Sequence, residues 1–122
     1  METCINCSVL VKKETKIWRL PDILILRLYK DERLRKYPME LDMNGFVHCQ
    51  SPEQGGTNYT LYGMAVHIGK TYSSGHFVSK VRNLGSSNDL WHIYNDTEVH
   101  KCRPEDVMST PAYNLFYIKR TA

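Results

Sequence analysis

Hydrophobic and polar residues alternate over several segments of the chain, and this alternation predicts β-strands. Residues 59–69 ("YTLYGMAVHIG") are apolar at both alternating positions, which predicts a central strand covered on both faces. Residues 76–82 ("HFVSKVR") and 90–95 ("LWHIYN") alternate as half-buried strands do. Another aromatic strand is predicted over residues 112–120.

The first half of the chain holds weaker strand signals. Aliphatic residues follow Pro21, so the pattern of residues 17–29 predicts the approach to a buried strand. Residues 35–43 predict a second, shorter strand that bends at Pro38. Residues 45–58 are rich in Gly, Ser, Asn and Pro and predict a loop.

One short helix is expected over residues 103–108, where Pro104 stands in the first turn and acidic residues lie near the N-terminus. The predicted fold is therefore α+β, predominantly antiparallel β, in a single unit over residues 1–122. A single short helix can hardly cover both faces of the central strand. We therefore expect part of its cover to be missing.

The two half-buried strands predict a hairpin, because residues 83–89 ("NLGSSND") form a turn sequence. Opposed residues of an antiparallel pair have a constant sum of residue numbers. Opposing His76 to Asn95 also opposes Arg82 to Asp89 and leaves residues 83–88 as the loop. A register slip of one residue would bring Asp96 to His76 instead.

An imidazole beside an amide is the usual support for a nucleophile. The side-chain oxygen of Asn95 would accept a hydrogen bond from one imidazole N–H, which leaves the other nitrogen of His76 as a base. Asp96 would support the loop, help to stabilise the oxyanion region, or replace Asn95 as the orienting residue.

Composition and charge restrict the partners and the cellular compartment that we expect for this protein. The net charge of +3 and the lack of a basic stripe argue against a nucleic-acid partner. The longest aliphatic run, residues 23–26, is too short to cross a membrane, and no signal peptide is visible. We expect an intracellular protein, in the cytoplasm, the nucleus or both, with reduced thiols or a metal site rather than disulfides.

The chain has four cysteines. Cys4 and Cys7 form a C-x-x-C pair, which is half of a zinc site. Cys49 lies in a polar loop and is interpreted as incidental, and Cys102 as a small buried hydrophobic residue.

Several boxes occur in a fixed order, and together they resemble the C-terminal half of the catalytic domain of ubiquitin-specific proteases. The boxes are Tyr59-Thr60-Leu61, His67-Ile68-Gly69, Gly75-His76-Phe77, Trp91, Tyr94-Asn95-Asp96, Val99 and Tyr113-Asn114-Leu115-Phe116-Tyr117. Upstream, the C-x-x-C pair, a Leu-Pro before the strand and "YPMELDM" are similar to family segments in the same order.

The resemblance implies the palm-side half of a papain-like cysteine protease fold with part of its fingers, and (iso)peptide hydrolysis at the ubiquitin C-terminus. By motif position His76 would be the general base, Asn95 its orienting residue, and Asp96 an auxiliary acid near the oxyanion region. Residues 69–75 would border the channel for the ubiquitin tail, with Gly69, Gly75 and Phe77 binding substrate. Cys4 and Cys7 would match half of the zinc ribbon, so a structural zinc ion would be possible only with the missing half, and we expect no stoichiometric zinc in this chain.

The sequence departs from the family pattern at important points. Phe77 replaces the usual Tyr, residues 26–29 read Leu-Arg-Leu-Tyr instead of Leu-Lys-Arg-Phe, and the Asn-x-x-Cys nucleophile box is absent. We therefore expect a partial catalytic domain that is inactive alone, needs no cofactor for catalysis, and has ubiquitin or ubiquitinated proteins as partners. The alternatives are a non-catalytic module that binds ubiquitin or a protease, and a zinc-binding domain built on Cys4 and Cys7.

Overall fold

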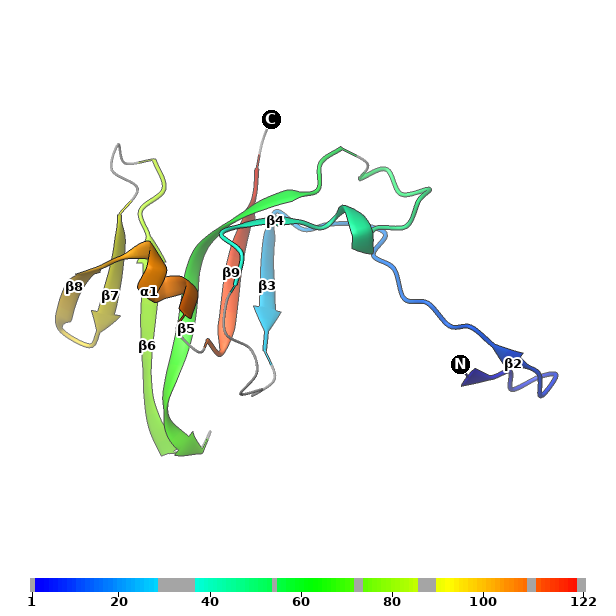
Figure 1. Ribbon diagram of the computed structural model, residues 1–122, viewed down its shortest axis with the longest axis horizontal. Coiled ribbons are helices and arrows are strands. Elements are labelled where there is room, and N and C mark those ends of the chain that lie inside the picture. Colours follow the sequence, from blue (N-terminus) through cyan, green and yellow to red (C-terminus); the bar gives the residue numbers. More distant parts are fainter. Residues whose placement is uncertain are drawn as a thin grey trace.

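An antiparallel sheet forms the body of the computed structural model, which describes residues 2–28, 37–53, 55–71, 74–85, 90–109 and 112–120 (Figure 1). Its strands are β3 (Ile23–Arg27), β4 (Glu40–Asp42), β5 (Asn58–Thr71), β6 (Ser74–Arg82), β7 (Trp91–Asn95), β8 (Glu98–Cys102) and β9 (Asn114–Lys119). A 3-10 turn, η1 (Asn44–Phe46), and one helix, α1 (Pro104–Ser109), complete this body. Two short strands, β1 (Glu2–Thr3) and β2 (Leu10–Val11), form a separate hairpin.

The strand order is β3-β9-β5-β6-β7-β8, with β4 paired to β5 beside this path. Every strand pair of the sheet is antiparallel, as the sequence predicted. The last strand, β9, inserts between β3 and β5, so the first and the last strand of the sheet in chain order are neighbours. The strand nearest the C-terminus is therefore paired on both sides and is not an edge strand.

The long central strand β5 carries the core on one of its faces. Tyr59 and Leu61 are fully buried, and Met64 and Val66 continue the same face after a bulge between Leu61 and Gly63. On the other face Tyr62, Ala65 and His67 are only partly buried. The prediction that both faces of this strand are covered is therefore wrong for the described chain, whereas the expectation of an incomplete cover is confirmed.

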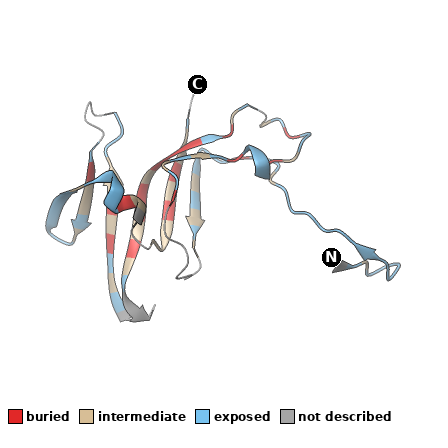
Figure 2. Cartoon of the chain, viewed as in Figure 1, coloured by how far each residue is buried: buried red, intermediate tan, exposed pale blue. Residues whose placement is uncertain are grey.

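Helix α1 lies over the buried face of the sheet (Figures 1 and 2). Val107 of α1 is fully buried and belongs to the same core cluster as Trp91, Tyr117 and Leu61. The Tyr117 hydroxyl donates to the Pro38 carbonyl oxygen at 2.8 Å, which satisfies a polar group inside this core. The predicted helix over residues 103–108 is thus confirmed within one residue at each end.

The strands of the first half differ from their predictions. β3 is an edge strand whose Ile23 and Ile25 are exposed, while Leu24 and Leu26 pack on the core, so it is not a buried strand. Only Glu40–Asp42 of the predicted residues 35–43 form a strand, and residues 35–36, like Tyr29 of the earlier segment, lie outside the described residues. An edge strand has no neighbour to protect its outer side, so aliphatic composition alone does not distinguish it from a central one.

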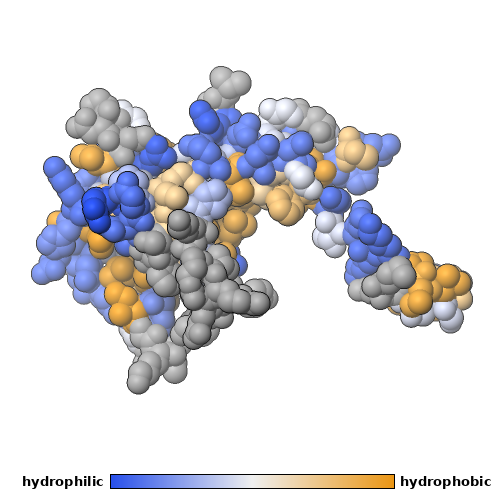
Figure 3. Space-filling model, viewed as in Figure 1, coloured by the Kyte–Doolittle hydropathy of each residue, from blue (hydrophilic) through white to orange (hydrophobic). Residues whose placement is uncertain are grey.

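The β1–β2 hairpin stands away from the sheet at the end of an extended segment (Figure 1). The extended segment joins the body at Lys16, whose Nζ donates to the Gly45 carbonyl oxygen, and at a bridge between Ile17 and Val47. Hydrophobic surface gathers on the hairpin in Figure 3, where Ile5 is 98% exposed. Among the described residues, no helix is long and apolar enough to cross a membrane.

Candidate active site

His76 and Asn95 meet at one end of the sheet, where β6 and β7 leave the cover of α1. Nε2 of His76 lies 2.6 Å from Oδ1 of Asn95. An amide oxygen only accepts, so the imidazole Nε2–H donates this hydrogen bond. The bond fixes the ring and its tautomer and leaves Nδ1 as the nitrogen that can take a proton.

The register that brings these residues together differs from the predicted one by two residues. Arg82 opposes Trp91, not Asp89, and Ser79 opposes Tyr94, so Asn95 falls opposite Val78 by extension. The turn is therefore longer than predicted, and the backbone N–H of Asn83 donates across it to the carbonyl oxygen of Leu90. A shift of two keeps every side chain on its face of the sheet, and the imidazole therefore reaches Asn95 diagonally.

Asp96 lies close to the same imidazole but less directly. Its Oδ2 is 3.8 Å from Nε2 of His76, and its side chain is 79% exposed. Its φ of 53° is left-handed, because Asp96 begins the two-residue turn between the paired residues Asn95 and Glu98. The Asn95 amide is therefore the direct hydrogen-bond partner of the imidazole, and the Asp96 carboxylate lies farther away on the solvent side.

Gly75 allows the two strands to approach each other closely beside His76. It has a φ of +144°, and a Cβ at this position would lie 2.5 Å from the Ile68 carbonyl oxygen and 2.7 Å from Nε2 of His67. Neither neighbour can be avoided by a side-chain rotation at residue 75 itself. A glycine is thus required here by space as well as by backbone conformation.

Phe77 points to the opposite face of the sheet from His76, because successive residues of a strand alternate. Its ring is in a chain of contacts: 4.7 Å to the His67 ring and 5.5 Å to the Tyr113 ring, while Arg27 lies 5.0 Å over Tyr113. We call these four residues the aromatic row. Phe77 is 50% exposed within it, so the row is open to a ligand.

Sequence patterns do not predict the aromatic row as a unit. His67 and Tyr113 stand in the quoted motifs. The β5–β6 pairing opposes His67 to Phe77, and the insertion of β9 beside β5 brings Tyr113 to them. The predicted loop over residues 69–75 is instead the end of the β5–β6 hairpin, in which Thr71 pairs with Ser74. Gly69 lies on β5 near that end, and residues 72–73 are outside the described part of the chain.

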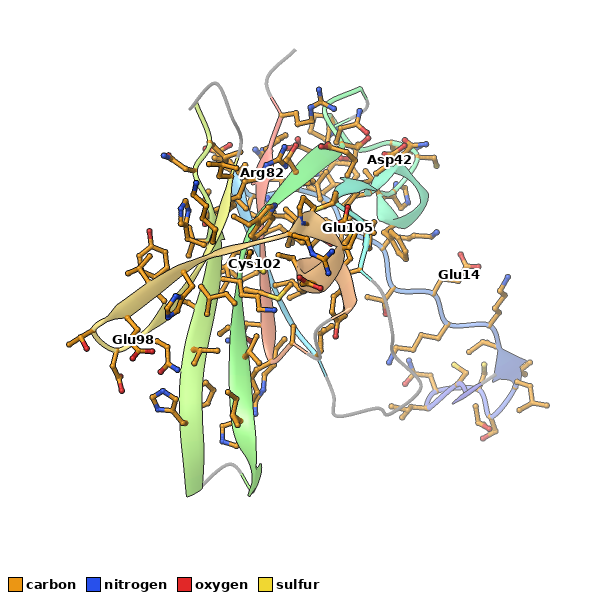
Figure 4. All side chains as sticks on the ribbon, turned by 60° about the vertical axis from the view of Figure 1, so that its left-hand side comes forward. Glu14, Asp42, Arg82, Glu98, Cys102 and Glu105 are labelled. Atoms are coloured by element: carbon orange, nitrogen blue, oxygen red, sulfur yellow. The ribbon has the colours of Figure 1, made fainter. Side chains whose placement is uncertain are left out.

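The thiols of the chain lie away from His76. On β8, Cys102 opposes Trp91 of β7. Glu98, at the other end of β8 and roughly 13 Å from Cys102 along the strand, opposes Asn95. Figure 4 shows Glu98 at the tip of the β7–β8 hairpin and Cys102 beside α1. Burial raises the pKa of the Cys102 thiol, which disfavours the thiolate form. Its interpretation as a small hydrophobic residue agrees with this environment.

The other three cysteines belong to different regions. Cys49 is exposed and follows η1, which lies with β4 at the Asn58 end of β5. Cys4 and Cys7 lie in the turn between β1 and β2, where hydrogen bonds from the Cys7 side chain and from the backbone N–H groups of Cys7 and Asn6 lower the pKa of Cys4. Two thiols in one turn fit half of a tetrahedral zinc site, and no group of three metal-ligating side chains occurs among the described residues.

Comparison with known proteins gives the same assignment over nearly the whole chain. The family model described as ubiquitin carboxyl-terminal hydrolase matches residues 1–117. The chain is 33% identical to ubiquitin carboxyl-terminal hydrolase 21 of Arabidopsis thaliana over 96% of its own length and 17% of that protein. It is 32% identical to ubiquitin carboxyl-terminal hydrolase 17-like protein D of Mus musculus over 89% of its length and 21% of that protein. The chain thus spans about a fifth of these relatives or less.

Solved structures share the fold described above. In the SAGA deubiquitinating module Ubp8/Sgf11/Sus1/Sgf73 bound to monoubiquitin, a chain that is 27% identical matches 99% of this chain with a TM-score of 0.75, over 29% of its own length. The same module bound to ubiquitin aldehyde gives a TM-score of 0.71 at 27% identity, over 88% of this chain and 26% of that one. Because the family model covers the strands that carry His76 and Asn95 as well as the core, the chain belongs to the ubiquitin carboxyl-terminal hydrolase family.

Proposed function

We propose that this chain contributes the general base and its orienting residue to thiol-dependent hydrolysis of (iso)peptide bonds at the ubiquitin C-terminus. The observation that carries the proposal is the 2.6 Å hydrogen bond between His76 and Asn95. It leaves one imidazole nitrogen for a thiol while the amide holds the other. The nucleophilic cysteine would come from a segment other than this chain, since the chain's own thiols lie in other regions.

In this mechanism His76 accepts the thiol proton at Nδ1, and the thiolate attacks the carbonyl carbon at the end of the ubiquitin tail. The imidazolium then returns the proton to the leaving amine as the carbon–nitrogen bond breaks, which gives a thioester. His76 next takes a proton from water, whose oxygen attacks the thioester and releases the ubiquitin carboxylate and the thiol. Asn95 holds the ring through both transfers and stabilises its cationic form.

We further propose that the ubiquitin tail passes the end of the β5–β6 hairpin that carries His76, where Gly69 and Gly75 lie. Phe77 offers a half-exposed ring on the opposite face of the sheet from His76, so it can contact only a part of ubiquitin that reaches that face. Two solved neighbours contain bound ubiquitin or ubiquitin aldehyde, which supports ubiquitin as the partner.

A chimeric enzyme tests the catalytic proposal. Residues 1–120 would replace the matching segment of the Arabidopsis thaliana hydrolase, so that its other segments supply the nucleophile. We expect hydrolysis of a fluorogenic ubiquitin C-terminal substrate by the chimera and none by the chain alone. His76→Ala should lower kcat by roughly 10²–10⁴-fold, the usual contribution of a general base.

His100→Ala is the matched control, because this histidine is an exposed residue of the neighbouring strand, with a side chain that is 67% exposed. It should leave kcat within about twofold, as for a surface substitution far from the chemistry. Turnover that survives His76→Ala, or turnover by the isolated chain, would contradict the assignment.

The alternative function is a non-catalytic module that binds ubiquitin. The open sheet face favours it, because it carries hydrophobic side chains that are about half exposed: Ile25, Phe77, Tyr94 and Val99. Saturable binding of ubiquitin by the folded chain, together with a chimera whose turnover does not depend on His76, would support this alternative over the catalytic proposal.

A further inference from the structure

Two thiols lie in hydrogen-bond contact in the turn of the β1–β2 hairpin. The Cys7 side chain donates a hydrogen bond to the Cys4 sulfur. Two backbone hydrogen bonds hold the turn: the Cys4 N–H donates to the Val9 carbonyl oxygen at 2.7 Å, and the Ser8 N–H donates to the Cys4 carbonyl oxygen at 2.9 Å. The backbone therefore keeps the two sulfurs together before any reagent arrives.

The two thiols of the turn differ in exposure. Cys7 is exposed, whereas Cys4 is partly buried. A dissolved oxidant therefore meets the Cys7 sulfur first and finds the Cys4 sulfur directly behind it. An accessible thiol beside a second, resolving thiol is the arrangement of cysteines that are oxidised reversibly.

The other two thiols of the chain lie apart from this pair. All four cysteines of the sequence are among the described residues. Cys49 follows η1, and Cys102 ends β8, where its thiol donates to the Arg103 carbonyl oxygen at 3.6 Å. The hairpin stands clear of both in Figure 1. A disulfide between Cys4 and Cys7 is therefore the one that the chain can form without a rearrangement of its fold.

We propose that Cys4 and Cys7 form a reversible disulfide when hydrogen peroxide oxidises the hairpin. The Cys7 sulfur attacks one peroxide oxygen, the oxygen–oxygen bond breaks, and Cys7 becomes a sulfenic acid while one water molecule leaves. The Cys4 sulfur then attacks the Cys7 sulfur, the sulfur–oxygen bond breaks, and the hydroxyl group leaves as water with the Cys4 proton. The peroxide gains two electrons, and each sulfur loses one.

The disulfide makes the turn a redox-sensitive device. In the oxidised hairpin neither sulfur is a free thiol, so neither can bind a metal ion or react with an alkylating reagent. Two molecules of a reducing thiol such as glutathione restore the pair, because they supply the two electrons and leave as glutathione disulfide. None of these steps involves His76 or Asn95, so the proposal is independent of the proposed hydrolysis.

Treatment of the reduced 122-residue chain with hydrogen peroxide, in the presence of a chelator, tests this proposal. We expect the free thiols to fall from four to two per chain. Trypsin releases residues 1–12 as one peptide that contains both hairpin cysteines, and its mass should fall by that of two hydrogen atoms. Excess glutathione should restore all four thiols. The same oxidation in denaturant should be severalfold slower, because the hairpin no longer holds the sulfurs together.

Cys4→Ser should stop the reaction at the sulfenic acid of Cys7, which dimedone traps as a covalent adduct. Cys49→Ser, a matched exposed thiol elsewhere, should leave the disulfide in residues 1–12 unchanged. The far-ultraviolet spectrum of each variant shows whether the sheet is retained, since the hairpin is separate from it. Four thiols that persist after peroxide, disulfides that link two chains, or an equal rate in denaturant would overturn the proposal.

Discussion

The two faces of the sheet come from alternate residues of the same strands, yet they differ sharply in exposure. On the face under α1, Trp91 is 2% exposed and Leu115 is 3% exposed. On the opposite face, Tyr94 is 44% and Phe77 is 50% exposed (Figure 2). Aromatic residues are equally available to both faces, so composition does not explain the difference. Helix α1 and the segments that carry Leu20, Tyr37 and Met43 explain it, because they all pack on the same face.

The comparison separates the residues that stabilise the fold from those that are open to a partner. His76 and Asn95 lie on the face under α1 but beyond its cover: Ile68, which opposes His76, is 55% exposed. The candidate base is thus attached to the rigid core while its imidazole remains accessible. The predictions below test this division, beginning with the largest expected effect.

Truncation of Trp91 should destabilise the protein most. Trp91→Ala removes a buried ring from the centre of the core, and we expect a loss of about 3–5 kcal/mol in the free energy of unfolding. Tyr94→Ala on the open face is the matched control, with an expected change of about 0.5 kcal/mol or less. Chemical denaturation measures both changes in the free energy of unfolding. It is followed by far-ultraviolet spectroscopy, which does not rely on tryptophan fluorescence. Equal losses would show that the open face is also part of the core.

Replacement of Gly75 should have the next largest effect. Gly75→Ala places a Cβ against the Ile68 carbonyl oxygen and the His67 ring, and strain of this kind costs about 1–3 kcal/mol. Gly85→Ala is the control, because Gly85 also has a positive φ, +91°, but has no atom within 4 Å of an added Cβ. The same denaturation assay should show the larger loss for Gly75→Ala. A larger loss for Gly85→Ala would mean that backbone conformation, not close approach, requires the glycine.

Alkaline pH should weaken the covered face through Tyr117. Burial raises the pKa of Tyr117 to about 12, so the folded protein keeps this hydroxyl protonated where the unfolded chain begins to ionise. Its contribution to stability is complete below the unfolded pKa of about 10 and is lost as the pH rises toward the folded value. Tyr117→Phe should flatten this part of the stability curve, whereas Tyr94→Phe should not. An unchanged curve in Tyr117→Phe would assign the alkaline loss to other groups.

Acid should also lower the stability, by a smaller amount, through an ion pair at the edge of the core. Lys119 lies 2.9 Å from Glu53, and their hydrogen bond lowers the pKa of Glu53. The stabilisation is present above the unfolded pKa of this carboxyl group and is lost as the pH falls through its folded pKa. Glu53→Gln should reduce the dependence of stability on pH in this acidic range. Glu14→Gln, at the exposed Lys12–Glu14 pair, should change it less.

Sequence patterns predicted the strands whose burial alternates and missed those without such a signal. β8 has exposed residues at Glu98, Val99 and His100, so its sequence lacks the contrast that marks a half-buried strand. β1 and β2 have only two residues each and pack on no core. The edge position of β3 follows from the return of β9, a long-range contact that local composition does not encode.

The candidate site was predicted in part because a β-strand conserves its faces under a shift of two residues. The predicted register was wrong, yet His76 and Asn95 remained on one face and their side chains meet. Had the shift been one residue, Asp96 would have replaced Asn95. The aromatic row was not predicted as a unit, because Arg27, Tyr113 and Phe77 come from strands that are distant in sequence.

The most direct test of the account is the tautomer of His76 in the isolated chain, read from the ¹⁵N chemical shifts and couplings of its ring. The hydrogen bond to Asn95 predicts a proton on Nε2 in the neutral form, and a mixture of tautomers after Asn95→Ala. Asn114→Ala, on a strand away from the site, should leave the spectrum of His76 unchanged. A proton on Nδ1, or the same spectrum with and without Asn95, would contradict the central claim that this chain carries a preformed base and its orienting residue.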